Sequence, residues 1–166
     1  WYFNGDEWFY PASMYKVPLM MLLSERVKSG DLTQDTYIYD KPVSEIEELI
    51  LVYSNNEWAH YIRTYLGGDE QWRTEAKKYA SLKDDEYDPD YMDYCYFNNR
   101  YMTSVMKTLY SDPDSYPNVI DCLLRAEPTH YFRLSQSIDG VYDVAQKYGS
   151  FDDQIGQSFN HTTGII

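Results

Sequence analysis

At 166 residues the chain is long enough for one domain with a buried core. Its apolar content of 43% and its 19 tyrosines indicate a packed globular protein rather than a disordered one. The formal net charge of −13 would be repelled by phosphate backbones, so we expect no nucleic-acid partner. The longest apolar run, Val17–Leu23, is too short for a membrane span and contains Pro18.

The first ten residues, Trp1–Tyr10, combine strand-like aromatic side chains with the turn signal Asn4-Gly5-Asp6. We expect a hairpin or strand end that delivers the chain to a first helix at 13–29. Pro18 is compatible with this helix because it lies near the first turn, and Gly30 supplies a C-terminal stop.

The middle of the chain has mostly helical patterns. Spacing and capping signals predict further helices, in chain order, at 43–52, 57–66, 69–80, 100–110 and 118–125. The stretch 81–99 is the least regular, and its acidic run Asp84–Asp90 is expected to be a solvated loop. Near the C-terminus, Val141–Gln146 alternates like a strand, and Phe159–Ile166 has the pattern of a second strand.

These elements predict an α+β fold in a single domain over residues 1–166. A mainly helical lobe would carry part of an antiparallel sheet at both chain ends. The chain begins at Trp1 without a Met and ends inside a strand-like segment, so we expect it to be a segment of a longer protein. A missing leader therefore carries no information on localisation.

Metal-binding residue types are sparse. Cys95 and Cys122 are the only cysteines, they form no Cys-x-x-Cys pair, and the three histidines are scattered. We expect no metal site, and two cysteines alone do not establish a disulfide.

Ser13 and Lys16 are three residues apart at the start of the first predicted helix, so their side chains share one helix face. A lysine whose pKa is lowered by burial and nearby cations can take the proton of a serine hydroxyl. The helix N-terminus adds backbone N–H groups beside the serine. The competing interpretation is a chance Ser-x-x-Lys with Ser13 as a plain N-cap.

Two other polar clusters are weaker on their own. Ser54-Asn55-Asn56 lies between two predicted helices and offers a hydroxyl and an amide to a cleft, or simply a helix N-cap. Lys147-Tyr148-Gly149 follows the strand Val141–Gln146 and offers an ammonium group and open backbone to an anion, or an exposed lysine at a turn.

In this order the three clusters resemble the penicillin-recognising serine enzymes, which comprise the class A β-lactamases and the D,D-peptidase penicillin-binding proteins. Pro11-Ala12-Ser13-Met14-Tyr15-Lys16 is similar to the family's Pro-Ala-Ser-x-x-Lys. Leu51–Asn56 is similar to its apolar approach to Ser-Asp-Asn, and Val144–Lys147 to its approach to Lys-Thr-Gly. The resemblance runs from residue 9 to residue 166.

The resemblance implies the helical lobe and sheet of the β-lactamase/transpeptidase-like fold, with a substrate cleft between them. It implies that Ser13 is the acylated nucleophile, that Lys16 accepts its proton, and that Ser54 passes a proton to the leaving nitrogen. The implied substrate-binding residues are Asn56, Lys147, Tyr148, Gly149 and Ser150. The backbone N–H groups of Ser13 and of a residue near Ser150 would form the oxyanion hole.

The same resemblance implies a β-lactam or peptidoglycan-like small-molecule substrate, no cofactor, and a bacterial protein that is secreted or attached to the cell surface. For the β-lactamases, it also implies a role in antibiotic resistance. It gives no oligomeric state.

The sequence departs from the family pattern in three places. Asn55 replaces the Asp of Ser-Asp-Asn, and Tyr148 replaces the short hydroxyl residue of Lys-Thr-Gly. The Glu-x-x-x-Asn pattern that releases the acyl group in class A enzymes is absent. The candidates to replace its acid are Glu86, Asp88, Asp90 and Asp93.

Three activities therefore remain open. The first is a β-lactamase-like hydrolase that hydrolyses the lactam amide through an acyl-enzyme. The second is a penicillin-binding D,D-peptidase or esterase with slow or no deacylation. The third is a catalytically silent cell-wall binding module.

Overall fold

The computed structural model describes residues 4–126, 142–152, 156 and 158–166. Its helices, with η marking a 3-10 helix, are η1 (Ala12–Tyr15), α1 (Lys16–Lys28), α2 (Val43–Leu51), α3 (Asn56–Tyr65), α4 (Asp69–Ala76), η2 (Lys77–Tyr79), η3 (Asp84–Glu86), α5 (Pro89–Tyr94), α6 (Asn99–Ser111), η4 (Pro113–Ser115) and α7 (Pro117–Arg125). Its strands are β1 (Tyr37–Ile38), β2 (Lys41–Pro42), β3 (Ala145–Asp152) and β4 (Ser158–Ile165). A helical lobe with separate antiparallel pairs confirms the predicted α+β class.

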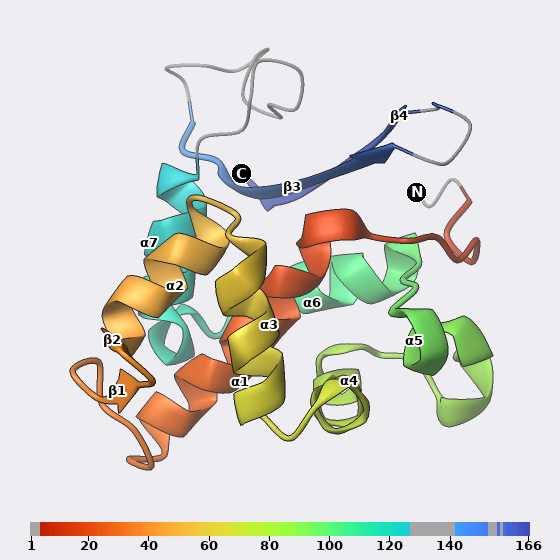
Figure 1. The fold of residues 1–166 in the computed structure, drawn as a ribbon. Helices are drawn as coiled ribbons and strands as arrows, with labels where there is room; N and C mark the ends of the chain where they lie inside the picture. The colour runs from red at the N-terminus through yellow and green to blue at the C-terminus, as the bar shows by residue number, and fades with distance from the viewer. Residues whose placement is uncertain (1–3, 127–141, 153–155, 157) are drawn as a thin grey trace.

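Helix α1 lies at the centre of the helical lobe (Figure 1). All its residues from Lys16 to Ser24 are buried, and most of them are apolar, which is typical of a helix enclosed on every side. Pro18 is the third residue of α1. It costs no helical hydrogen bond there, because N–H groups in the first turn have no carbonyl partner within the helix.

The other helices pack around α1 and bury one face each. Helices α2, α3, α4 and α7 all contact α1, and α2 also packs against α3 and α7. The amphipathic helix α6 buries Val105 and Leu109 completely. The predicted helices of the lobe are thus confirmed to within a few residues at their ends, except that the last part of 69–80 forms η2.

Strands β3 and β4 form an antiparallel ribbon across one end of the lobe (Figure 1). Lys147 pairs with Thr163 and Gly149 with His161 in this ribbon. Strand β3 lies against η1 and α7, and β4 lies against η1 and α6. The contact with η1 brings the ribbon to Ser13.

The N-terminal segment is described only from residue 4 onwards. Among the described residues 4–10, one strand-like contact is recorded, an antiparallel bridge between Phe9 and Phe97. In the described chain the ribbon beside η1 is formed by the C-terminal end. Residues 1–3 of the predicted N-terminal strand lie outside the described residues, so sheet at that end stays a prediction. Trp8 and Phe9 pack against the helical core.

Two local predictions are wrong. The acidic run Asp84–Asp90 is not all loop, because it contains η3 and the start of α5. The signal was present: Asp88 accepts a hydrogen bond from the Asp90 N–H at 2.8 Å and Pro89 occupies the first helical position. The strand expected at Val141–Gln146 begins instead at Ala145, so Lys147 lies inside β3 rather than after it. Val141 lies outside the described residues.

No helix in the described part of the chain is long and apolar enough to cross a membrane. Cys95 and Cys122 are both buried free thiols. Within the described ranges, no group of three or more His, Cys, Asp or Glu side chains is arranged to hold a metal ion.

Candidate active site

The Lys16 ammonium group is the point at which the predicted clusters meet. Its Nζ lies 3.0 Å from Ser13 Oγ and 2.6 Å from Asn56 Oδ1. It also lies 2.6 Å from the backbone oxygen of Ser54 and 3.2 Å from Ser54 Oγ. An ammonium group has three hydrogens, so four oxygen neighbours exceed its donors. A neutral Lys16 amine can instead accept the hydrogen of Ser13.

Burial changes the protonation of Lys16. The side chain is fully buried at the start of α1, and no Asp or Glu among the described residues forms an ion pair with it. Desolvation lowers its pKa to about 8, and the Arg63 guanidinium adds to the shift. A substantial fraction of Lys16 is therefore neutral near pH 8.

The Ser54-Asn55-Asn56 turn contains both a helix N-cap and residues that contact Lys16. Asn55 is the N-cap of α3, accepting a hydrogen bond from the Trp58 N–H at 2.9 Å. Its neighbours Ser54 and Asn56 are the residues that reach Lys16. Ser54 has a φ of 56°, a left-handed conformation that costs energy in a non-glycine residue, and such strained residues cluster at functional sites.

Lys147 on β3 joins the same network from the opposite side. Its Nζ donates to Ser54 Oγ at 2.9 Å, so the Ser54 hydroxyl lies between two lysines. Lys147 is fully buried, and its pKa is lowered to about 7 by desolvation and by the charge of Lys16. A continuous path of polar atoms thus runs from Ser13 through Lys16 and Ser54 to Lys147.

Gly149 lets β3 approach the turn that holds Ser13. A Cβ atom there would lie 2.7 Å from both Pro11 O and Ser13 N, closer than such atoms approach in proteins. Any larger residue would push β3 away. The preceding Ala12 has a φ of 46°, so the backbone before Ser13 is held in a strained, left-handed conformation.

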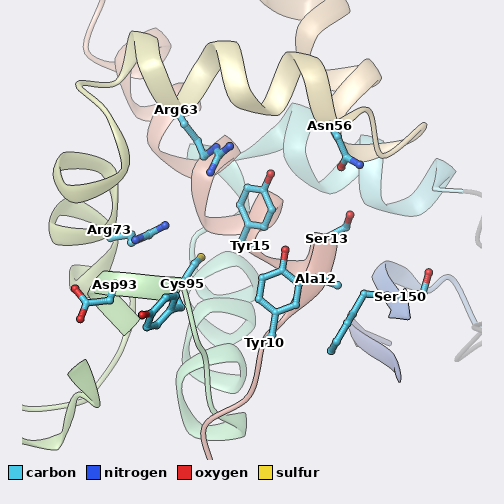
Figure 2. Close-up of a pocket in the computed structure, with 12 residues that line it drawn as sticks. Tyr10, Ala12, Ser13, Tyr15, Asn56, Arg63, Arg73, Asp93, Cys95 and Ser150 are labelled. Carbon is cyan, nitrogen blue, oxygen red and sulfur yellow. The ribbon is translucent and has the colours of Figure 1, made fainter. Parts of the chain in front are cut away.

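An open cavity of about 550 Å³ lies over Ser13 (Figure 2). Ser13, Asn56 and Ser150 lie at one side of it in this view, and Arg73 and Asp93 lie at the other. The other lining residues are Tyr10, Ala12, Tyr15, Arg63, Tyr94, Cys95 and Phe151. Tyr148 and Gly149 do not line the cavity; the Tyr148 ring centre lies 4.4 Å from Lys147 Nζ.

Comparison with known proteins identifies the fold that carries these residues. The model of the family described as "Beta-lactamase enzyme family" matches residues 1–46, which include Ser13 and Lys16. No curated protein matches the chain. A β-lactamase from Chitinophaga pinensis superimposes with a TM-score of 0.79 at 18% identity, over 98% of this chain and 73% of that one.

Two further solved structures cover both branches of the superfamily. The TLA-3 extended-spectrum β-lactamase has a TM-score of 0.78 at 16% identity, over 98% of this chain and 72% of that one. A point mutant of PBP-A, solved as an acyl-enzyme complex with penicillin G, has a TM-score of 0.72 at 18% identity, over 98% of this chain and 74% of that one. The chain has the β-lactamase fold. Its predicted resemblance to the β-lactamase and penicillin-binding superfamily is confirmed.

Within this β-lactamase fold, the four acidic residues considered from the sequence lie differently. Glu86 accepts hydrogen bonds from the Lys83 N–H and from Arg100, and Asp88 caps α5. Asp93 is the one of the four that lines the cavity, and it is exposed. In the described chain no carboxylate therefore contacts Ser13 or Lys16 directly.

Sequence reasoning missed the arginines of this cavity. Arg63 follows Asn56 by two turns of α3, so a signal existed: residues at that spacing share a helix face. Arg73 had no local signal, because only tertiary packing brings α4 to the cavity.

Proposed function

We propose that this chain is a serine hydrolase of the β-lactamase and penicillin-binding type, in which Ser13 forms an acyl-enzyme with a β-lactam or a related peptide-like substrate. The observation that supports it best is the 3.0 Å contact between Ser13 Oγ and a buried lysine whose pKa is lowered to about 8. Ser13 lines an open cavity, and the fully buried Lys16 contacts it from within the protein.

In acylation, the residues of the polar path from Ser13 to Lys147 act one after another. Neutral Lys16 takes the proton of Ser13 as Oγ attacks the substrate carbonyl, forming the C–O bond. As the C–N bond breaks, Ser54 gives its proton to the leaving nitrogen and regains one from Lys16 or Lys147. The two lysines on either side of the Ser54 hydroxyl, at 3.2 and 2.9 Å, make this relay direct.

Binding uses the remaining predicted residues. Because Asn56 Oδ1 accepts from Lys16, its amide hydrogens are left for a substrate carbonyl. Lys147 attracts the substrate carboxylate while it is protonated. The N–H of Ser13, with one from β3 near Ser150, stabilises the oxyanion, and Gly149 keeps β3 close enough for this.

Release of the acyl group is slow in this proposal, as in a penicillin-binding protein. A deacylating water needs a base, and Asp93 is the only acid that lines the cavity from the described residues. Asp93 is exposed and lies across the cavity from Ser13 (Figure 2). The family resemblance also leads us to propose a bacterial, extracytoplasmic protein; any role in antibiotic resistance depends on lactam turnover.

Incubation with a fluorescent penicillin, followed by denaturing electrophoresis, tests the proposal. We expect covalent labelling of the chain, complete loss of labelling in Ser13→Ala, and normal labelling in the control Ser29→Ala at the far end of α1. A chromogenic lactam should give a burst and then a plateau. Steady turnover would instead indicate a β-lactamase, and no labelling at high ligand concentration would indicate a silent binding module.

A further inference from the structure

Two arginines line the cavity but do not contact Ser13 or take part in the proton transfers of acylation. Arg63 comes from α3 and Arg73 from α4, and both face the space that Ser13 faces. In Figure 2, Tyr15 lies between them and Ser13. The Arg63 guanidinium carbon lies 5.7 Å from the centre of the Tyr15 ring, so it is held against this wall.

The two guanidinium groups are incompletely neutralised. Asp69 is shared between them: it accepts from Arg63 Nη1 at 3.1 Å and lies 3.5 Å from Arg73 Nη2. Arg73 is 6% exposed and also donates to the backbone oxygen of Met92. The Nε atoms of both arginines are buried and have no hydrogen-bond partner among the described residues. One half-exposed carboxylate therefore serves two cations that retain donor capacity.

The charge around the cavity has the opposite sign to that of the chain. The chain carries a net charge of −13, yet Arg63 and Arg73 line this cavity and Lys16 and Lys147 lie buried beside it. Among the described residues, Asp93 is the only acid in the lining, and its exposed charge is screened by water. Such a concentration of cations attracts anions into the cavity.

We propose that Arg63 and Arg73 form an anion subsite that binds a carboxylate on the acyl side chain of the substrate. This inference rests on the proposed acylation of Ser13. The preferred substrate is then dianionic, with one carboxylate attracted by Lys147 and a second at the arginines on the far side of Tyr15. The planar guanidinium group is suited to a carboxylate because it offers parallel N–H donors.

Matched penicillins test the subsite. The probes are 6-acylaminopenicillanates with succinoyl, glutaroyl or adipoyl side chains, and each is paired with the methyl amide of its side-chain carboxylate. The second-order rate of Ser13 acylation is measured by intact mass spectrometry. We expect at least one carboxylate probe to react about tenfold faster than its amide, which corresponds to about 1.4 kcal/mol. Benzylpenicillin, whose acyl side chain is uncharged, serves as the reference.

Variants locate the preference in the arginines. Arg63→Gln should reduce the carboxylate-to-amide rate ratio severalfold, Arg63→Lys should retain part of it, and Asp93→Asn should increase it. Arg26→Gln removes one positive charge from α1 outside the cavity and should leave the ratio unchanged. Thermal melting confirms that each variant is folded. The ratio is internal to each variant, so a general loss of acylation does not imitate the effect.

The outcomes separate the two proposals. Equal rates for every matched pair, with benzylpenicillin acylation intact, overturn the subsite alone. So does a preference that survives in Arg63→Gln and increases in neither Asp93→Asn nor at low salt. If no penicillin acylates Ser13, the proposed function fails and the subsite inference fails with it.

Discussion

Helix α1 contacts two buried ionisable clusters that have opposite charge and opposite consequences. At its start, Lys16 lies with Lys147 beside an open cavity, and burial lowers the pKa values of both lysines to about 8 and 7. Two turns later, Ser24 donates to the fully buried Glu47 on α2 at 3.0 Å, and burial raises the pKa of that carboxyl. Asn118 on α7 donates to its other oxygen at 3.1 Å.

The same desolvation therefore produces two different kinds of site. The lysine cluster contacts Ser13, which lines the cavity, so a neutral amine can act there as a base and its destabilising burial is coupled to chemistry. The hydrogen-bonding partners of Glu47, Ser24 and Asn118, do not line that cavity and connect helices of the lobe. An unusual pKa indicates a functional residue where that residue contacts a group that a substrate can reach.

The two clusters also predict opposite pH dependences of stability. The unfolded pKa of a lysine is about 10.4, so the unfolded chain binds more protons than the folded one, and stability rises from about pH 7 towards pH 10. For Glu47 the folded pKa lies above the unfolded value. The folded chain then binds more protons, and stability falls as pH rises through that folded pKa.

The largest expected effect is the loss of acylation when the base Lys16 is replaced. Lys16→Met should lower the Ser13 acylation rate by a factor of about 10³ or more, because the base is lost. The free energy of unfolding at pH 7 should rise, because a buried cation without an ion pair is replaced by an apolar chain. Stopped-flow acylation and chemical denaturation measure the two effects. Lys28→Met, at the exposed end of α1, should change neither by a comparable amount.

Gly149→Ala tests whether the closeness of β3 holds the lysine cluster together. The added Cβ would meet backbone atoms of Pro11 and Ser13 at 2.7 Å, so β3 must move. We expect a loss of about 1–3 kcal/mol in unfolding free energy and at least about a tenfold loss in acylation. Gly30→Ala, at a φ of 86° with open space around it, should reduce stability without slowing acylation. Unchanged acylation in Gly149→Ala would contradict this account of the strand.

The acylation rate should depend on pH because it depends on the protonation of Lys16 and Lys147. The active form needs a neutral Lys16 and a protonated Lys147; because the pKa of Lys147 (about 7) lies below that of Lys16 (about 8), the rate should be bell-shaped with a maximum between about pH 7 and pH 8. Arg63→Gln removes a charge that lowers the Lys16 pKa, so the rising limb should move to higher pH. A rate that increases steadily to pH 10 would show that Lys16 has an ordinary pKa.

The smallest expected effect is a change in the free energy of unfolding when the buried Glu47 is replaced. Glu47→Gln keeps the shape and hydrogen-bonding capacity of the side chain but removes the need to bury a charge. At pH 8 we expect the unfolding free energy to rise by on the order of 1 kcal/mol and to fall less with increasing pH. Acylation should remain within about twofold of the parent. A destabilised Glu47→Gln would show that the charged carboxylate is favoured in the fold.

Local signals predicted most of the helices because they state where each helix begins and ends. Asn55 and Asn98 both cap helices, and the apolar run of α1 required a buried position. Strand β3 begins later than the sequence predicted. Its residues Ala145–Asp152 are mixed in polarity, and they form a strand because they pack against η1 and α7. Such contacts leave no periodic trace in the sequence.

The candidate site was predictable to a similar extent. Ser13, Lys16 and Ser54 could be named from motif order, and the structure brings them within hydrogen-bond distance, while their catalytic roles stay predictions. Arg73 could not be found this way, since α4 reaches the cavity only through packing. The organisation of residues 1–166 as one domain of a longer protein also stays a prediction.

Peptide mapping after exposure to benzylpenicillin tests the reactive hydroxyl most directly. We expect the intact chain to gain the mass of a single penicillin molecule and fragmentation to place it on Ser13, with the adduct persisting for longer than it takes to form. An unmodified chain, or an adduct on any other residue, would contradict this expectation.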